Sequence, residues 1–326
     1  MKKRWLIVLL LCISVIPVIL LSLSTGASGL GMPDTSTAMG QSIFLLRKTR
    51  IITGFIVGAA LSCAGVVFQA LLRNPLAEPY ILGISSGAGL GSAIAILIGA
   101  ATMNVFALPA VSFISAVITL MLVFRIASNN GNVPSIYSLI LSGVIISSIC
   151  SSMLMFIVAV APVEGMHSVV WWMLGNLQPA NSSLLFISSI LILAGISILW
   201  TMSPEMNAMT LGTETAHYLG VRTNFVLYTT LAIATLITAS AVGLAGLIGF
   251  IGLIVPHAAR QIIGPNHKSL LPVSALLGGI FLVMCDTISR IILAPREIPV
   301  GVITALFGGP FFLILLRTRR KQGWIG

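Results

Sequence analysis

The chain has 326 residues, of which 57% are apolar and only 7% are charged, with 17 lysines and arginines against seven acidic residues. Soluble domains carry about 25% charged residues, so this composition excludes a soluble fold and indicates a membrane protein. The basic residues punctuate apolar segments instead of forming a stripe on a polar face, which argues against nucleic-acid binding although the sequence pI is about 10.1.

Apolar segments bounded by charge, proline or asparagine predict an all-α integral membrane protein with about ten spanning helices in one domain, 1–326. A spanning helix needs about 20 apolar residues. The first segment follows Lys2, Lys3 and Arg4, so a signal peptide is the alternative to a retained first helix. The predicted spans are 5–24, 51–72, 80–99, 105–126, 135–160, 182–200, 223–242, 247–263, 270–292 and 300–316.

The basic residues predict an orientation with both termini on the cytoplasmic side, because positive charge favours that side. The basic amino terminus and the cluster at 317–321 then agree, and twelve basic residues fall inside. The remaining five fall outside, against the rule: Arg47, Lys48, Arg50, Arg290 and Arg296.

This topology also predicts two opposed four-helix groups. The group formed by the second to fifth spans starts on the outer side, and the group formed by the seventh to tenth spans starts on the inner side. The two groups therefore run in opposite senses, which is the arrangement of an inverted repeat. Substrate paths often lie between the halves of such a repeat.

Two prolines mark a compact polar gap after the second span, Arg73-Asn74-Pro75-Leu-Ala-Glu78-Pro79. A tight turn in which the arginine and the glutamate neutralise each other is the structural interpretation. In the next span Gly83, Gly87 and Gly91 recur every four residues, so we expect another helix to approach this face closely.

A glycine-rich segment from Gly243 through Gly249 to Gly252 precedes Pro256, His257 and Arg260. Glycine costs up to about 1 kcal/mol relative to alanine in a helix, so the segment predicts a bent or short span close to a neighbour. His257 is a candidate proton carrier, but a lone histidine without a carboxylate partner favours a packing role.

The inner gap 201–222 contains two helix starts, at Ser203-Pro-Glu205 and at Thr213-Glu214, each with a capping hydroxyl and an acid in the first turn. Gly212 and Gly220 are expected to end these two short helices. The segment is either an ordered surface loop or a docking element for a soluble partner.

Charge inside the spans is confined mainly to Asp286, with Arg290 four residues later on the same helix face. A carboxylate there favours a local ion pair, and the alternative is that the pair shapes an outer binding surface. The chain has no Walker, nucleophile-elbow or His-Glu-x-x-His motif, and its four cysteines lack CxxC spacing. We therefore expect no catalytic residue, no metal site and no bound cofactor.

Three blocks of residues resemble the FecCD-like permease family of iron-siderophore, haem and cobalamin type II ABC importers. The first runs from Gly65-Val-Val-Phe-Gln69 through the proline gap to Leu82-Gly83-Ile-Ser-Ser-Gly87. The second is Gly249-Phe-Ile-Gly-Leu-Ile-Val-Pro256-His257 with Arg260, and the third is Glu297-Ile-Pro299-Val-Gly301 through 309–312. The resemblance covers the whole chain.

The resemblance implies a permease subunit in a bacterial-type cell membrane, paired with a second copy or a close paralogue. Two ATPase subunits, which would carry ATP and Mg, lie below it and a substrate-binding protein lies above it. The outer arginines Arg47, Arg50 and Arg290 match positions that receive acidic residues of the binding protein, and Arg296 is a further candidate. The ATPase-coupling loop matches Leu211, Gly212, Thr213, Glu214, Ala216, Leu219 and Gly220.

The implied mechanism is alternating access without covalent chemistry, with the span at 135–160 lining the pathway and 162–179 at the outer gate. A ferric siderophore is the favoured cargo, with cobalamin and haem as alternatives. From the residues themselves, an ion-coupled secondary carrier and a membrane anchor remain open. Scarce buried charge argues against the carrier, and the many glycines in the spans argue against the anchor.

Overall fold

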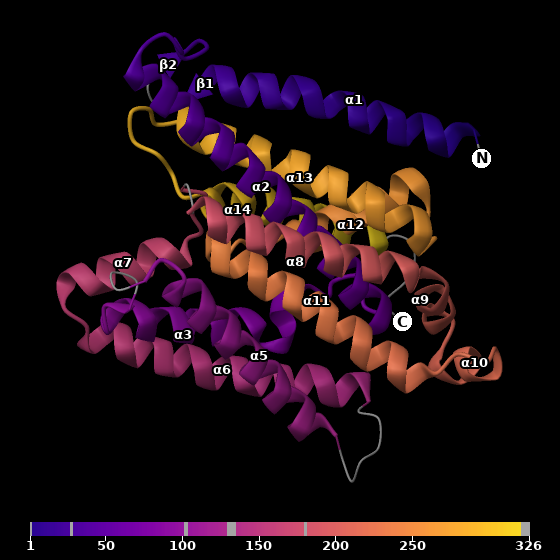
Figure 1. The fold of residues 1–326 in the computed structure, drawn as a ribbon. Coiled ribbons are helices and arrows are strands. Elements are labelled where there is room, and N and C mark those ends of the chain that lie inside the picture. The colour runs from indigo at the N-terminus through magenta and orange to yellow at the C-terminus, as the bar shows by residue number, and fades with distance from the viewer. Residues whose placement is uncertain (1, 27–28, 101–103, 129–134, 179–180, 321–326) are drawn as a thin grey trace.

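The computed structural model describes residues 2–26, 29–100, 104–128, 135–178 and 181–320, so that Lys321 of the carboxyl-terminal cluster and Pro179 of the outer-gate segment lie outside the described residues. Within them the chain is almost wholly helical (Figure 1). The elements up to the long second helix are α1 Lys2–Ser24, β1 Thr25–Gly26, β2 Gly29–Leu30 and α2 Ala38–Leu71.

The middle of the chain contains a short 3-10 turn, η1, and helices of unequal length. These elements are η1 Pro79–Leu82, α3 Ile84–Leu97, α5 Ala107–Ala127, α6 Ile136–Val160, α7 Val163–Met173 and α8 Ser182–Thr201. The remaining helices are α9 Ser203–Thr210, α10 Thr213–Tyr218, α11 Thr223–Ala245, α12 Ile251–Ile263, α13 His267–Ile291 and α14 Val300–Arg320. A helix therefore lies at each of the ten predicted spans, and α9 and α10 are the two short helices expected in the inner gap. The predicted hydroxyl caps are wrong, because Met202 and Gly212 hold the N-cap positions and neither helix has a side-chain cap.

Six of these helices are long and apolar enough to cross a membrane: α2, α5, α6, α8, α11 and α13. The other four are shorter apolar helices over Val8–Ser24, Ile84–Leu97, Ile251–Ile263 and Val300–Ile314. This is the all-α polytopic architecture that the composition predicts.

Helix α2 begins well before its predicted start, at Ala38 instead of residue 51. Thr37 caps it, with its Oγ1 accepting a hydrogen bond from the Gly40 N–H at 3.1 Å. At 34 residues the helix is about 50 Å long, which exceeds the roughly 30 Å hydrocarbon core. The basic residues Arg47, Lys48 and Arg50 consequently lie on a helix and not in a loop.

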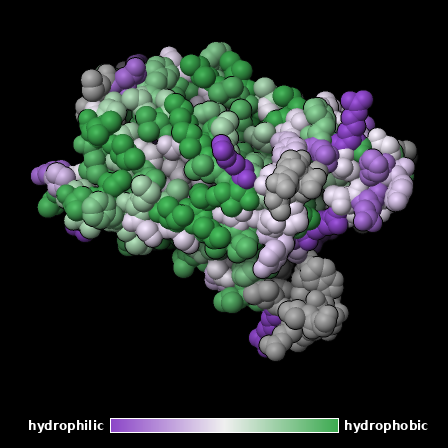
Figure 2. All heavy atoms as spheres, turned by 90° about the horizontal axis from the view of Figure 1, so that it is seen from below, coloured by the Kyte–Doolittle hydropathy of each residue, from purple (hydrophilic) through white to green (hydrophobic). Residues whose placement is uncertain are grey.

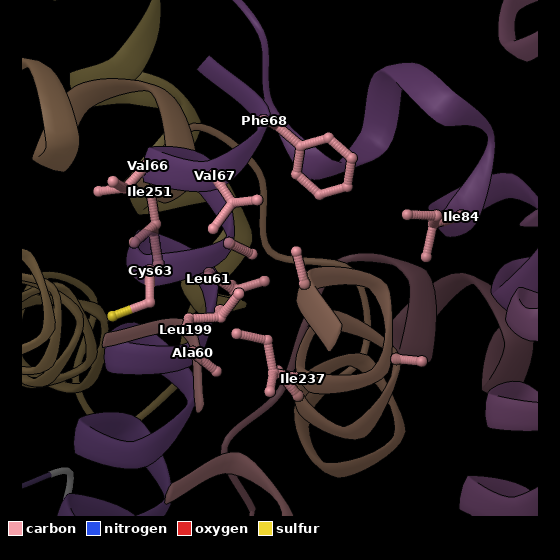
Figure 3. Packing of buried hydrophobic residues seen from close by; sticks show 14 of the residues in the cluster. Ala60, Leu61, Cys63, Val66, Val67, Phe68, Ile84, Leu199, Ile237 and Ile251 are labelled. Carbon is pink, nitrogen blue, oxygen red and sulfur yellow. The ribbon is translucent and has the colours of Figure 1, made fainter. Parts of the chain in front are cut away.

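The core forms around α2, whose most apolar stretch is 83% buried in the chain. Helix α13 packs along it most extensively, and α11 and α12 cover other parts of its surface (Figure 1). Figure 3 shows the centre of this packing, where Cys63, Val67 and Phe68 of α2 lie near Ile237 and Ile251. By contrast, only 17% of the most apolar stretch of α6 is buried.

The two ends of the bundle differ. Helices α9 and α10 lie at one end with the start of α1, and β1, β2 and α7 lie at the other (Figure 1). We call these the inner end and the outer end, after the predicted topology. Seen from below, hydrophobic residues cover much of the surface, and hydrophilic residues gather mainly toward the inner end (Figure 2).

Helices α3 and α12 hold corresponding places in the two predicted four-helix groups, each being the second helix of its group. Both are short, at 14 and 13 residues. Each is preceded by a residue in the left-handed region, Gly83 at φ 79° and Phe250 at φ 69°. This correspondence supports the inverted repeat, which remains a prediction.

Candidate functional site

Four charged side chains form one network at the outer end. Arg50 of α2 donates from Nε to Asp286 Oδ1 at 2.8 Å and from Nη1 to Glu297 Oε2 at 2.7 Å. Arg290 completes the network with its Nε 3.0 Å from Asp286 Oδ2. The local ion pair predicted for Asp286 and Arg290 is thus confirmed, and Arg50 joins it from a distant part of the chain.

Two arginines of this region also hold the end of α1. Arg290 donates from Nη1 to the Thr25 carbonyl at 2.8 Å and from Nη2 to Ser22 Oγ at 2.7 Å. Arg47 donates from Nη1 to the carbonyls of Leu23, at 2.6 Å, and Gly31, at 3.0 Å. Carbonyls at a helix end lack hydrogen-bond donors within the helix, and the N–H groups of these two guanidinium groups serve as their donors.

Accessibility separates the predicted docking residues into two kinds. Arg47 and Arg290 are only 7% and 2% exposed, so within the single chain their side chains face inward. Arg50 is mostly covered, whereas Lys48 and Arg296 are exposed. Docking of a binding protein stays a prediction for all of these residues. Lys48 and Arg296 are the ones whose charge is accessible to such a partner.

A cavity of about 290 Å³ lies beside the network and connects it to the segment after α7. Arg50 and Glu297 line it together with Trp171, Asn176 and Gln178. Pro299 also lines it, and the Gly301 N–H donates to the Leu174 carbonyl at 3.1 Å, which ties the start of α14 to the end of α7. The outer network and the predicted outer gate therefore belong to one polar surface.

The 3-10 turn η1 that precedes α3 and the non-helical segment that precedes α12 meet in the interior. The Tyr80 hydroxyl donates to the Ile248 carbonyl at 2.9 Å and accepts from the Ile248 N–H at 3.1 Å. The Glu78 carboxylate lies near the Phe250 N–H. The two bonds of Tyr80 satisfy backbone groups that the break between α11 and α12 leaves without helical partners.

Gln69 and Arg260 extend this junction toward the inner end. Gln69 Nε2 donates to the carbonyls of Gly252 and Leu253 at 3.2 and 3.3 Å, and its Oε1 accepts from Arg260 Nη1 at 3.0 Å. His257 packs edge-on to Phe311, with ring centroids 6.1 Å apart. The motif residues from both halves of the chain therefore form one contact region between α2, η1 and α12.

The proline gap between α2 and η1 is an ordered turn. Asn74 Oδ1 accepts from the Leu76 N–H at 2.9 Å, and Pro75 and Pro79 fix the chain on either side. Pro79 lies against Gly252, and Gly249 lies near the Tyr80 ring. Pro256 lies inside α12, as the sixth residue of a helix that begins at Ile251.

The inner loop exposes apolar side chains on and beside the short helix α10. Leu211, Tyr218 and Leu219 are 67%, 87% and 63% exposed, and Glu214 of α10 is also exposed. Ala216 is fully buried and anchors α10 to the bundle. Large exposed apolar groups at the predicted aqueous end are typical of a partner surface.

A groove of about 580 Å³ lies beneath α10. It is lined by Glu214 and His217 of α10, by Arg73 after α2, and by Ile136 at the start of α6. Helix α10 and the start of α6, the helix predicted to line the pathway, therefore face the same groove.

A model of the FecCD transport family matches residues 6–318. The chain belongs to the FecCD transport family. It is accordingly a multi-pass membrane permease subunit of an ABC importer for metal chelates and not itself an enzyme.

Relatives of the permease differ in cargo. It is 40% identical to the cobalamin import system permease protein BtuC of Halobacterium salinarum, over 90% of this chain and 77% of the relative. It is 36% identical to the Fe(3+)-citrate import system permease protein YfmE of Bacillus subtilis, over 96% and 97%. An inward-facing structure of a putative metal-chelate type ABC transporter is 31% identical, with a TM-score of 0.87 and coverage of 96% and 99%.

Sequence reasoning missed Tyr80 of the permease and the capping role of Arg47 and Arg290. The signal for Tyr80 was a single hydroxyl-bearing aromatic residue directly after the two-proline gap and before an apolar helix. The capping role had no local signal, because the carbonyls of Ser22, Leu23 and Thr25 lie far from both arginines in the sequence.

Proposed function

We propose that the permease passes a ferric siderophore from an extracytoplasmic binding protein to the cytoplasm by alternating access. Two copies of the permease would form the pathway, and two separate ATPase subunits would drive it through α9 and α10. The observation that carries the proposal is the junction of the two interrupted segments, where the Tyr80 hydroxyl binds the Ile248 backbone just before α12. Interrupted helices in corresponding positions of two halves mark the substrate path in many transporters.

The exposed face of α6 supports the proposals that this helix lines the pathway and that a second copy of the permease faces it. Helix α6 spans 25 residues without a charged side chain and carries six serines, at 138, 142, 147, 148, 151 and 152. Ser148 and Ser152 are exposed, as are Leu141, Ile145 and Phe156. A second copy facing this helix would enclose a wall of weakly polar and apolar groups.

Such a wall suits a metal that is already chelated. A bare cation needs carboxylate, imidazole or thiolate ligands from the protein, whereas a chelate brings its own. Cobalamin and haem meet the same condition, so they remain alternatives to the ferric siderophore. The family assignment removes the ion-coupled secondary carrier.

Competition uptake tests the cargo. Cells that carry the full transporter would be given labelled ferric siderophore, cobalamin and haem, each with excess unlabelled competitors. We expect saturable uptake of the ferric siderophore that its own unlabelled form abolishes and the other two leave unchanged. Uptake of cobalamin or haem alone would overturn the siderophore proposal, and uptake of none in an assembled complex would overturn chelate transport.

A further inference from the structure

The two carboxylates that Arg50 contacts at the outer end differ in how firmly they are held. Asp286 lies on α13, its side chain is 2% exposed, and it also faces Arg290. Glu297 lies in the non-helical segment before α14, and its side chain is 34% exposed. Partly exposed ion pairs are weak, so Glu297 is the carboxylate that another acid can replace at Arg50.

Replacement of Glu297 requires only a rotation of its side chain. The neighbouring Ile298 N–H donates to the Ser289 carbonyl at 3.1 Å, so the backbone beside Glu297 is anchored to α13. Arg50 also keeps its position, because its Nε stays bound to Asp286 Oδ1 at 2.8 Å. The guanidinium group is therefore fixed on one side and exchangeable on the other.

The outer cavity of about 290 Å³ gives an incoming group access to this exchangeable side, because Arg50 and Glu297 both line it. Arg50 Nη2 donates to no described residue and retains accessible surface. Asn176 lines the same cavity, and its Oδ1 accepts from the Gln178 N–H at 2.9 Å, which leaves its Nδ2 as a donor without a described partner. Two such donors, one of them cationic, suit a carboxylate.

The charge balance of the network depends on Glu297. Two arginines and two carboxylates make the network neutral while Glu297 contacts Arg50. Departure of Glu297 would leave one positive charge without a counter-charge, and a carboxylate from outside would restore the balance. Glu297 therefore occupies Arg50 in the single chain in the same way as an acidic partner would.

We propose that Glu297 is an internal competitor for Arg50, which an acidic side chain of the extracytoplasmic binding protein displaces when it docks. The inference rests on the proposed function, which supplies this partner. The incoming carboxylate would accept from Arg50 Nη1 and Nη2 and from Asn176 Nδ2. The competition lowers the affinity of the complex, so that the binding protein leaves after it has delivered its cargo.

Equilibrium binding of the binding protein to the assembled transporter in nanodiscs tests the competition. We expect Glu297→Gln to tighten binding at least about tenfold, because it removes both the competing carboxylate and its repulsion of the partner's acid. Glu297→Asp keeps the charge but is one methylene shorter, so its contact with Arg50 weakens and binding should tighten about threefold. The thermal midpoint of each variant is measured alongside.

Two comparisons separate competition from a general loss of negative charge. Asp34→Asn removes an exposed acid at the same end and keeps the oxygen that accepts from Ser36, so affinity should change less than about twofold. In an Arg50→Lys background, one ammonium group cannot bind Asp286 and a second carboxylate with the geometry of the guanidinium fork. Glu297→Gln should then have no further effect.

The outcomes distinguish this inference from the proposed function. Wild-type or weaker binding in Glu297→Gln would show that Glu297 is a fixed brace and refute the competition. Equal tightening in Glu297→Gln and Asp34→Asn would refute it as well, since charge alone would then explain the effect. A wild-type transporter to which no binding protein docks would overturn that part of the proposed function and this inference with it.

Discussion

Arg50 and Asp286 lie 236 positions apart in the chain, yet Arg50 Nε donates to Asp286 Oδ1 at 2.8 Å. Asp286 is 1% exposed and also faces Arg290, so its single carboxylate serves two guanidinium groups. Removing one partner of a buried ion pair costs about 3–5 kcal/mol, because the remaining charge is left uncompensated. We expect Asp286→Asn to lower the thermal midpoint of the purified permease strongly.

Glu297→Gln is the matched control for this change. It removes the other carboxylate that Arg50 contacts, but the Glu297 side chain is 34% exposed and water can take its place. Partly exposed pairs contribute about 1 kcal/mol or less. Equal loss of thermal stability in the two variants would show that the burial of Asp286 does not matter.

Docking of a binding protein is best tested at the exposed outer charges. Arg290→Glu would place a second acid beside Asp286 in the interior, so a loss of docking there would reflect misfolding. We expect Lys48→Glu with Arg296→Glu to weaken binding of the partner about tenfold, with the thermal midpoint unchanged, since exposed charges mainly tune association. Surface plasmon resonance at two salt concentrations measures it.

The outcome of that measurement shows whether the binding protein docks on Lys48 and Arg296 or at Arg50. A weaker complex whose salt dependence also falls supports docking through Lys48 and Arg296. Unchanged affinity in the double variant would mean that the binding protein does not use them, and would leave Arg50, beside its cavity of about 290 Å³, as the outer contact.

The sequence predicted the helices well because apolar length is a local property. It placed α6 and α8 within one or two residues, and Gly212 and Gly220 correctly separated α9, α10 and α11. It failed where partners are distant. Nothing near Arg47 shows that the end of α1 needs donors, and nothing near Ile248 shows that its peptide meets the Tyr80 hydroxyl.

The start of α2 was predicted late for a different reason. Hydropathy measures burial in lipid, and residues 38–50 include three basic side chains, so the apolar pattern begins only at Ile51. The helix itself continues outward because Thr37 caps it and Arg47 and Arg50 find internal partners. The length of α2 is therefore not set by the thickness of the membrane.

Tyr80→Phe tests the junction between the interrupted segments. The change deletes one hydroxyl and leaves both the N–H and the carbonyl of Ile248 without that partner, at a cost of about 1–3 kcal/mol for each buried group. We expect a lower thermal midpoint and reduced uptake. Tyr137→Phe is the control, because Tyr137 is 76% exposed, and an equal effect of the two changes would contradict the structural role of the junction.

Two glycines of α3 provide a matched test of close helix packing. A Cβ at Gly87 would collide with the Thr119 side chain of α5, whereas a Cβ at Gly89 would make ordinary contact at 3.6 Å with Leu154. We expect Gly87→Ala to destabilise the permease by about 1–3 kcal/mol through overpacking, whereas Gly89→Ala gains helix propensity and stays neutral or better. Thermal unfolding in one detergent measures both, and the reverse order would refute this packing.

The inner loop carries the last prediction. Leu219 is 63% exposed and Glu214 lies one turn earlier on α10, so Leu219→Asp with Glu214→Lys changes the surface without disturbing the core. If this surface transmits ATP hydrolysis to α6, the assembled transporter should keep its ATPase activity and lose at least about tenfold in uptake. Arg125→Gln, exposed at the same end, should leave both rates unchanged. Normal uptake in the double variant would contradict coupling through α10.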